Sequence, residues 1–264
     1  MRIITFNIQR CVEKEWVKKR DYLCELISQK SPDILCLQEV RSSGLKYLVS
    51  KLEPIYVLGR GRDDGKDKGE FAPIITFNNN LKPINSGVFW LSPTPDIPSK
   101  GWNALCKRIC SWILFHDLTL KNKLLILNAH LDHFSNLART KSTELVIKKV
   151  LNHPEAKNNF IIAGDWNASE KSNAYCLIRN NSDLFVEDSF YSTRHKYDKT
   201  IDYTWEGVSK FGLWRNRIDY IFHGRNINID KYKAAPSKVD SIKISDHKHV
   251  IVDFNYSKEV LENQ

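Results

Sequence analysis

Residues 160–167 read Phe-Ile-Ile-Ala-Gly-Asp-Trp-Asn, and this stretch decides the fold class of the 264-residue chain. Its first four residues are apolar without alternation, which is typical of a strand covered on both faces. Asp165 and Asn167 follow at the point where such a strand ends. The stretch therefore predicts an α/β protein in which polar groups gather at one edge of a buried sheet.

Short apolar runs bounded by turn residues recur on both sides of this stretch. Helical patterns separate them early in the chain, whereas strand–strand connections dominate the middle, which favours two packed sheets flanked by helices. We see no linker or internal repeat, so we expect one domain over residues 1–264. The expected strands are Ile3–Ile8, Ile34–Leu37, Ala72–Phe77, Val88–Leu91, Ile109–Leu114, Leu124–Leu131, Phe160–Ala163, Tyr203–Trp205, Ile218–Phe222 and His249–Phe254.

Three amphipathic patterns predict helices. One contains Trp16 and Ile27 and ends before Pro32, and the others span Leu45–Leu52 and Leu137–Leu151. The glycine-rich, charged segment Gly59–Gly69 is expected to be an exposed loop. It lacks the strand–glycine–helix context of a phosphate-binding loop.

The composition narrows the class of partner. Hydrophobic residues make up 42% and charged residues 27% of the chain, as in ordinary globular proteins, and the formal net charge is +9. This charge favours polyanions, namely nucleic acid, anionic lipid or small phosphates, without choosing among them. The alternative is a merely basic, solvated surface.

The cysteines and the N-terminus bear on location. None of the six cysteines forms a Cys-x-x-Cys pair or a zinc-type spacing, which favours a reducing compartment. No apolar run approaches the roughly 20 residues of a membrane span, and residues 1–7 do not resemble a signal peptide. We expect a cytoplasmic protein, with signal-independent export as the alternative.

Acid, amide and imidazole groups stand at the ends of six expected strands. Glutamate, aspartate and asparagine oxygens suit a hard cation such as Mg²⁺, with Mn²⁺ as an alternative. A histidine beside a carboxylate suits acid–base work or stabilisation of a transferring phosphoryl group. These strand-end residues are Asn7, Glu39, His130 with Asp132, Asp165 with Asn167, Asp219, and Asp246 with His247.

The same residues lie in an ordered series of short motifs. The series resembles the motif set of the endonuclease/exonuclease/phosphatase superfamily, whose fold is like that of deoxyribonuclease I. The resemblance covers essentially the whole chain and implies a four-layered α/β/β/α sandwich. The motifs are Thr5-Phe6-Asn7-Ile8, Leu37-Gln38-Glu39, Asn128-Ala129-His130-Leu131, Gly164-Asp165-Trp166-Asn167, Arg217-Ile218-Asp219-Tyr220 and Ser245-Asp246-His247.

A further segment narrows the resemblance. Residues 87–95 read Gly-Val-Phe-Trp-Leu-Ser-Pro-Thr-Pro, and Lys107-Arg108-Ile109 follows shortly after. This segment is similar to a bacterial branch of the superfamily that shares features with the deadenylase-like members and whose substrates are poorly defined. One departure is Trp166, where relatives often carry phenylalanine; an aromatic residue is kept.

The resemblance implies a role for each motif. Glu39 would be the principal Mg²⁺ ligand, with Asn7 beside it and Asp246 contributing. Asp165 would align or deprotonate the attacking water, and Asn167 would hold water or a phosphate oxygen. His247, oriented by Asp219, would contact the scissile phosphate, and His130 would donate to a phosphate oxygen. The choice of Asp165 or His247 as the base is left open.

Cationic side chains are candidates for contacts with the substrate phosphate. Arg108 and Lys100 are candidates because anionic phosphate needs cationic donors, although each is equally explained as a surface charge. Asp132 is a candidate for shaping the substrate pocket.

The predicted function is a Mg²⁺-dependent phosphoesterase that hydrolyses mono- or diesters of a small organic phosphate by in-line attack of water. The substrate would be a phosphorylated small molecule or, alternatively, nucleic acid cleaved by a nuclease. A non-catalytic phosphate- or nucleic-acid-binding protein is a further alternative. Nothing in the sequence indicates an obligate protein partner.

Overall fold

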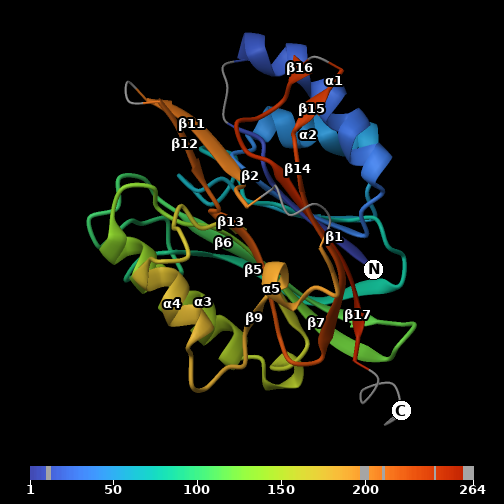
Figure 1. Ribbon diagram of the computed structural model, residues 1–264, viewed down its shortest axis with the longest axis vertical. Coiled ribbons are helices and arrows are strands. Elements are labelled where there is room, and N and C mark those ends of the chain that lie inside the picture. The colour runs from blue at the N-terminus through green and yellow to red at the C-terminus, as the bar shows by residue number, and fades with distance from the viewer. Residues whose placement is uncertain (10–12, 197–201, 210–211, 241, 258–264) are drawn as a thin grey trace.

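Two mixed sheets form the centre of the computed structural model, which describes residues 1–9, 13–196, 202–209, 212–240 and 242–257 (Figure 1). The first sheet holds β1 and β2 as parallel neighbours, and its other central pairings are antiparallel. In spatial order its strands are β10 (His195–Lys196), β14 (Ile227–Ala235), β17 (His249–Tyr256), β1 (Arg2–Asn7), β2 (Ile34–Gln38), β4 (Ile74–Thr76) and β3 (Tyr56–Leu58).

The second sheet contains one parallel pair, formed by the strands that end in His130 and Asp165. Its spatial order is β5 (Leu81–Trp90), β6 (Ile109–Asp117), β7 (Asn122–His130), β8 (Phe160–Asp165), β13 (Asp219–His223) and β9 (Glu187–Asp188). Two small hairpins stand apart, β11 (Trp205–Ser209) with β12 (Gly212–Asn216), and β15 (Lys238–Val239) with β16 (Ile242–Lys243).

Helices cover the outer face of each sheet, so the predicted four-layered sandwich is confirmed (Figure 1). The long helices are α1 (Glu13–Lys30), α2 (Ser42–Leu52) and α3 (Asn136–Leu151), and the short ones are α4 (Asn173–Arg179), α5 (Ser189–Ser192) and the 3₁₀ turn η1 (Pro154–Ala156). Helices α1 and α2 pack on the seven-stranded sheet, and α3 and α4 pack on the six-stranded sheet. None of the described helices is long and apolar enough to cross a membrane.

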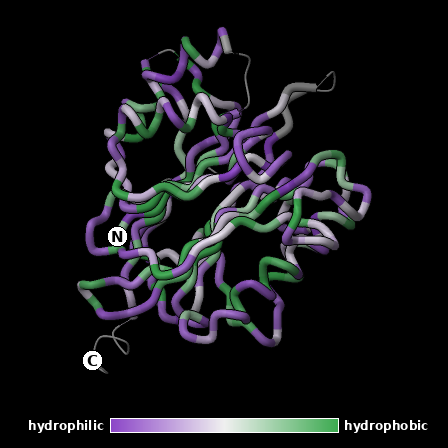
Figure 2. The backbone as a smooth tube through the Cα atoms, turned by 180° about the vertical axis from the view of Figure 1, so that it is seen from behind, coloured by the Kyte–Doolittle hydropathy of each residue, from purple (hydrophilic) through white to green (hydrophobic). Residues whose placement is uncertain are grey.

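Strand β8 is covered on both faces, which explains why its sequence is an uninterrupted apolar run. Phe160 and Ile162 pack in the layer toward α3 and α4, whereas Ile161 and Ala163 pack in the layer between the sheets. All four are fully buried, and burial of each large side chain contributes about 1.5–3 kcal/mol. The same pattern produces the hydrophobic strands through the middle of the molecule (Figure 2).

Strand β14 was not predicted. It alternates apolar and polar residues instead of forming an apolar run, and a register shift between Ile229 and Lys231 breaks the alternation. Helix α4 was also missed, because its seven residues are too few to show a helical period.

A buried polar bridge joins the two sheets beneath the strand ends. The side-chain amide of Gln38 on β2 donates to Asn128 Oδ1 on β7 at 2.7 Å and to Thr5 Oγ1 at 3.0 Å. Asn128 in turn donates to the carbonyls of Leu37 and Pro73 at 2.8 and 2.9 Å. Because buried polar groups are costly unless paired, this bridge fixes how the sheets face one another.

Buried His249 gives the fold a pH dependence. Burial, followed by the charges of Lys30 and Lys233, lowers the pKa of His249 to about 3. Protonation therefore favours the unfolded chain, and stability is lost as the pH falls below about 6.5 toward 3, by up to roughly 1.4 kcal/mol per pH unit. We expect urea unfolding of His249→Gln to show a shallower loss of stability between pH 6 and 4 than the parent. An unchanged slope, or an equal change in the exposed-site control His195→Gln, would contradict this assignment.

Candidate active site

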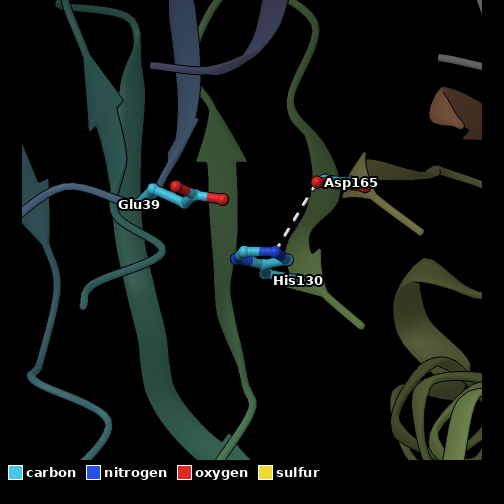
Figure 3. Close-up of side chains that lie close together, drawn as sticks. All are labelled: Glu39, His130 and Asp165. Carbon is cyan, nitrogen blue, oxygen red and sulfur yellow. Dashed lines mark ion pairs between the residues drawn. The ribbon is translucent and has the colours of Figure 1, made fainter. Parts of the chain in front are cut away.

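The predicted site residues from both sheets meet at one edge of the sandwich. His130 and Asp165 are register partners on parallel β7 and β8, and Asp165 is the partner of Asp219 on antiparallel β13. These three side chains therefore start from adjacent strands at one level. Glu39, which directly follows β2, approaches them from the other sheet (Figure 3).

A carboxylate–imidazole pair lies at the centre of the site. His247 Nδ1 and Asp219 Oδ2 are 2.8 Å apart, and both side chains are buried. Burial disfavours the charged imidazole, but the charge of Asp219 and its hydrogen bond outweigh burial and raise the pKa of His247 to about 10. His247 is thus a cation at neutral pH, and its Nε2 lies 3.9 Å from Asp165 Oδ2.

Asp165 lies between this pair and the other sheet. Its Oδ2 accepts a hydrogen bond from Asn7 Nδ2 at 2.9 Å, and its Oδ1 accepts from the backbone N–H of Asn167 at 2.9 Å. Burial, and then the charge of Asp219, raise the pKa of Asp165 to about 7. A carboxylate with this pKa is suited to accept a proton near neutral pH.

The backbone is shaped to support these groups. Gly164 has φ of 141°, and a Cβ there would lie 1.9 Å from the carbonyl oxygen of Ala129, so the position before Asp165 requires glycine. Glu39 and Asn167 adopt left-handed conformations with φ of 63° and 46°. Such conformations in non-glycine residues cluster at functional sites, where the surrounding structure holds the strain.

The donor set around Glu39 fits a hard cation. Ligand atoms of Glu39, His130 and Asp165 lie within 4.8 Å of one another. Asn7 donates to Glu39 Oε1 at 3.0 Å, and Asp246 Oδ1 is buried without a hydrogen-bond partner among the described residues. The Asn7 amide turns its nitrogen toward Glu39, because its Oδ1 accepts from the backbone N–H of Gln9 at 2.9 Å. Carboxylate oxygens, one of them uncommitted, are what Mg²⁺ or Mn²⁺ would require.

Cationic and imidazole groups lie beside this cluster. The Arg108 guanidinium lies 2.7 Å from His130 Nε2 and 2.8 Å from His133 Nδ1, and His130 Nε2 lies 3.5 Å from Asp165 Oδ2. Burial, and then the charge of Arg108, lower the pKa of His130 well below its usual range, so this imidazole is neutral. These groups can therefore supply neutral and charged donors to an anion.

These groups open into one cleft of about 380 Å³. Of the predicted residues, Glu39, Arg108, His130, Asp165, Asn167, Asp246 and His247 line it. Asn7 and Asp219 are fully buried behind this lining and hold Asp165 and His247.

The other two predicted substrate contacts lie elsewhere. Lys100 is exposed and does not line the cleft among the described residues. Asp132 is buried, and its carboxylate accepts hydrogen bonds from the backbone N–H groups of Leu105, Phe134 and Ser135. Asp132 thus joins the loop before β6 to the loop before α3, and it supports the wall that carries His133.

Gly59–Gly69 is a largely exposed loop as expected, except around Gly61 and Arg62, which are buried and half-buried. Arg62 lines the cleft together with Glu70, which follows the segment, and the two form an ion pair of 2.6 Å with side chains about one tenth exposed. The indole N–H of Trp90 donates to the carbonyl of Arg62 at 2.7 Å and holds the segment in place. Arg62 is thus the charged side chain of this segment that pairs inside the cleft, whereas Asp63, Lys66, Asp67 and Lys68 are exposed as expected.

Lys19 of helix α1 is buried, although it lies between the basic residues Lys18 and Arg20. Its ammonium group donates to the carbonyls of Ile8 and Gln9 at 3.0 Å and of Ile244 at 2.9 Å. Three carbonyls satisfy the three donors of an ammonium group. Lys19 thereby ties the segment after Asn7 to the segment before Asp246.

Arg217 anchors the start of β13 beneath Asp219. It is 5% exposed, and it donates to Asp188 Oδ2 at 2.6 Å and to Glu170 Oε1 at 2.6 Å. We expect Arg217→Met to lower the free energy of unfolding by about 3–5 kcal/mol, because it leaves a buried carboxylate without its partner. Urea unfolding tests this value, with Arg215→Met as control. The control removes a half-exposed ion pair and should cost less than about 1 kcal/mol; equal losses would show that Arg217 is no anchor.

A cleft lined by carboxylates, imidazoles and arginines at one edge of a two-sheet α/β sandwich is suited to bind a phosphoryl group and stabilise its transfer. The chain belongs to the endonuclease/exonuclease/phosphatase family, which it matches over residues 4–247. The predicted family and fold are thus confirmed.

Several relatives cover most of the chain. Uncharacterized protein L388 of Acanthamoeba polyphaga mimivirus is 25% identical over 96% of this chain and 100% of its own length. Tyrosyl-DNA phosphodiesterase 2 of Bos taurus is 24% identical over 83% of this chain, which spans 56% of that protein. Among solved structures, mannosyl-6-phosphatase Bt3783 of Bacteroides thetaiotaomicron VPI-5482 has a TM-score of 0.87 at 28% identity, covering 97% of this chain and 99% of that one.

Proposed function

We propose that this protein is a Mg²⁺-dependent phosphoesterase that removes the phosphoryl group from a small organic phosphate, with a phosphorylated sugar as the substrate class. The observation that carries the proposal is the buried series Asp219–His247–Asp165 beside Glu39 in one cleft. The similarity to a mannosyl-6-phosphatase over nearly the full chain supports a phosphorylated sugar as the substrate class. We also propose that residues 1–264 act as one domain in the cytoplasm.

The cation would be held by Glu39, with Asp246 contributing, and Asn7 would position the Glu39 carboxylate by its hydrogen bond. When bound, it would supply charge neutralisation at the phosphoryl oxygens. Arg108 and His130, which line the same cleft, would bind the same phosphoryl group. Together these groups fix phosphorus within reach of Asp165.

The chemical step is in-line attack of water on phosphorus. Asp165 accepts the proton of the attacking water as the new P–O bond forms, and Asn167 orients that water. The ester P–O bond breaks, and the leaving oxygen takes a proton from solvent. His247, kept cationic by Asp219, stabilises the negative charge that develops on the phosphoryl oxygens. Asp165 is assigned as the base because the charge and hydrogen bond of Asp219 keep His247 protonated, so that His247 has no free nitrogen to accept the proton.

A substrate panel tests the proposal. Purified protein with Mg²⁺ is given mannose 6-phosphate, other sugar phosphates, inositol phosphates, nucleotides, RNA and DNA, and His247→Ala and EDTA serve as controls. We expect release of inorganic phosphate from a sugar phosphate, abolished by both controls. Cleavage of a polynucleotide alone would replace this proposal by a nuclease, which the net charge of +9 and the similarity to tyrosyl-DNA phosphodiesterase 2 also favour. Binding without hydrolysis would indicate a non-catalytic protein.

A further inference from the structure

A second pocket of about 260 Å³ adjoins the catalytic cleft. Asp246 and His247 line both spaces. Strand β11 separates them, because Trp205 lines the cleft whereas the next residue, Glu206, lines the second pocket, and consecutive strand residues face opposite sides. The two spaces therefore meet at Asp246 and His247, and a group bound in the second pocket lies next to a phosphate bound against His247.

Two lysines of this pocket are cross-strand neighbours. Lys238 and Lys243 are direct register partners in the short antiparallel hairpin β15–β16, and both are exposed. Like charges placed directly opposite on paired strands are destabilising. Both side chains line the pocket, so the repulsion is concentrated where an anion would relieve it.

The charged residues that line the pocket carry an excess of positive charge, because three lysines face two carboxylates. Lys248 lies over the ring of Tyr203, with 3.5 Å between its Nζ and the ring centroid. The carboxylates that line the pocket among the described residues are Glu206 and Asp246. Glu206 is paired with Arg215 at 3.2 Å, and Asp246 accepts from the Trp205 indole at 3.2 Å.

We propose that this pocket is a subsite for a second phosphate group of the substrate, bound by Lys238, Lys243 and Lys248 while the first phosphate lies at His247. The inference rests on the proposed function and sharpens it, because it selects substrates with two phosphates over those with one. The second phosphate can belong to a small bisphosphate or to the next nucleotide of a polynucleotide, and both have the same chemistry.

The test compares matched substrates on a double variant. Lys238→Gln/Lys243→Gln is assayed with mannose 6-phosphate, with mannose 1,6-bisphosphate and with a 5′-phosphorylated thymidine dinucleotide. We expect KM for at least one two-phosphate substrate to rise about tenfold with kcat unchanged, as expected for loss of two charge-assisted contacts. Parameters for mannose 6-phosphate should not change. The control Lys82→Gln/Lys157→Gln removes the same charge at exposed sites outside the pocket and should leave all values unchanged.

The outcomes separate the subsite from the catalytic proposal. A rise in KM of the double variant for the sugar bisphosphate or for the dinucleotide supports the subsite. The substrate that shows the rise identifies the source of the second phosphate. Equal effects on one-phosphate and two-phosphate substrates, or no effect, overturn it. If nothing is hydrolysed, the proposed function fails, and calorimetric binding of mannose 1,6-bisphosphate and of the dinucleotide to the parent and the double variant still decides the subsite. Unchanged binding of both, or binding of neither, overturns it.

Discussion

Replacement of Asp219 by asparagine is expected to lower kcat for phosphoester hydrolysis by about 10³–10⁴-fold, comparable to removal of the orienting carboxylate of other catalytic histidines. Asp219 raises the pKa of His247 through its charge and its 2.8 Å contact with Nδ1. Without this charge, burial dominates and His247 loses its proton near neutral pH. The positive charge of His247, which stabilises the transferring phosphoryl group, is then lost.

Steady-state rates across a pH series measure this effect. In the parent, His247 remains charged up to about pH 10, so the alkaline limb of kcat contributed by this residue lies near that value. In Asp219→Asn the limb should move to lower pH. The control is Asp253→Asn, the same change in a partly exposed ion pair with Arg2 that lies outside the cleft. A rate for Asp219→Asn within threefold of this control would show that Asp219 does not act through His247.

Replacement of Glu39 by glutamine is expected to lower kcat/KM by about 10³-fold at fixed Mg²⁺ and to raise the Mg²⁺ concentration needed for half-maximal rate. The change keeps the shape of the side chain and an oxygen that can accept from Asn7, but it removes the charge that attracts a divalent cation. Calorimetric titration with Mg²⁺ alone gives a second measurement that needs no substrate.

Glu70→Gln is the matched control for Glu39. Glu70 is a buried carboxylate of the same cleft, and it is paired with Arg62 instead of lying in the cluster of Glu39, His130 and Asp165. Its replacement should leave the Mg²⁺ requirement unchanged. If both variants showed the same half-saturating Mg²⁺ as the parent, Glu39 would be a structural carboxylate.

Most of the site could be predicted because it lies at strand ends. The apolar run Phe160–Ala163, followed by Gly164, favours a doubly covered strand, and Asp165 then lies at its end. The same argument places His130 at the end of β7. Glu39 and Asp219 then follow from the pairing of β2 and β13 with the sheets.

The residues that were missed depend on contacts between distant segments. Arg62 and Glu70 are charged residues in or beside a glycine-rich stretch, and only the fold of that stretch against Trp90 places their ion pair in the cleft. Lys19 lies in a helix whose basic residues predict a solvated face, and its carbonyl partners come from residues 8, 9 and 244. No local pattern encodes such partners.

The amide bridge between Gln38 and Asn128 has a consequence for how this sequence can vary. Hydrogen bonds between amides are directional, whereas apolar contacts tolerate exchanges of similar volume. A few polar atoms therefore set the register of one sheet against the other, and the many apolar side chains between the sheets only need to fill space. Apolar residues between the sheets can therefore be substituted, in evolution or in a design for heat resistance, as long as these two amides are kept. Such substitutions should leave Glu39 close to Asp165.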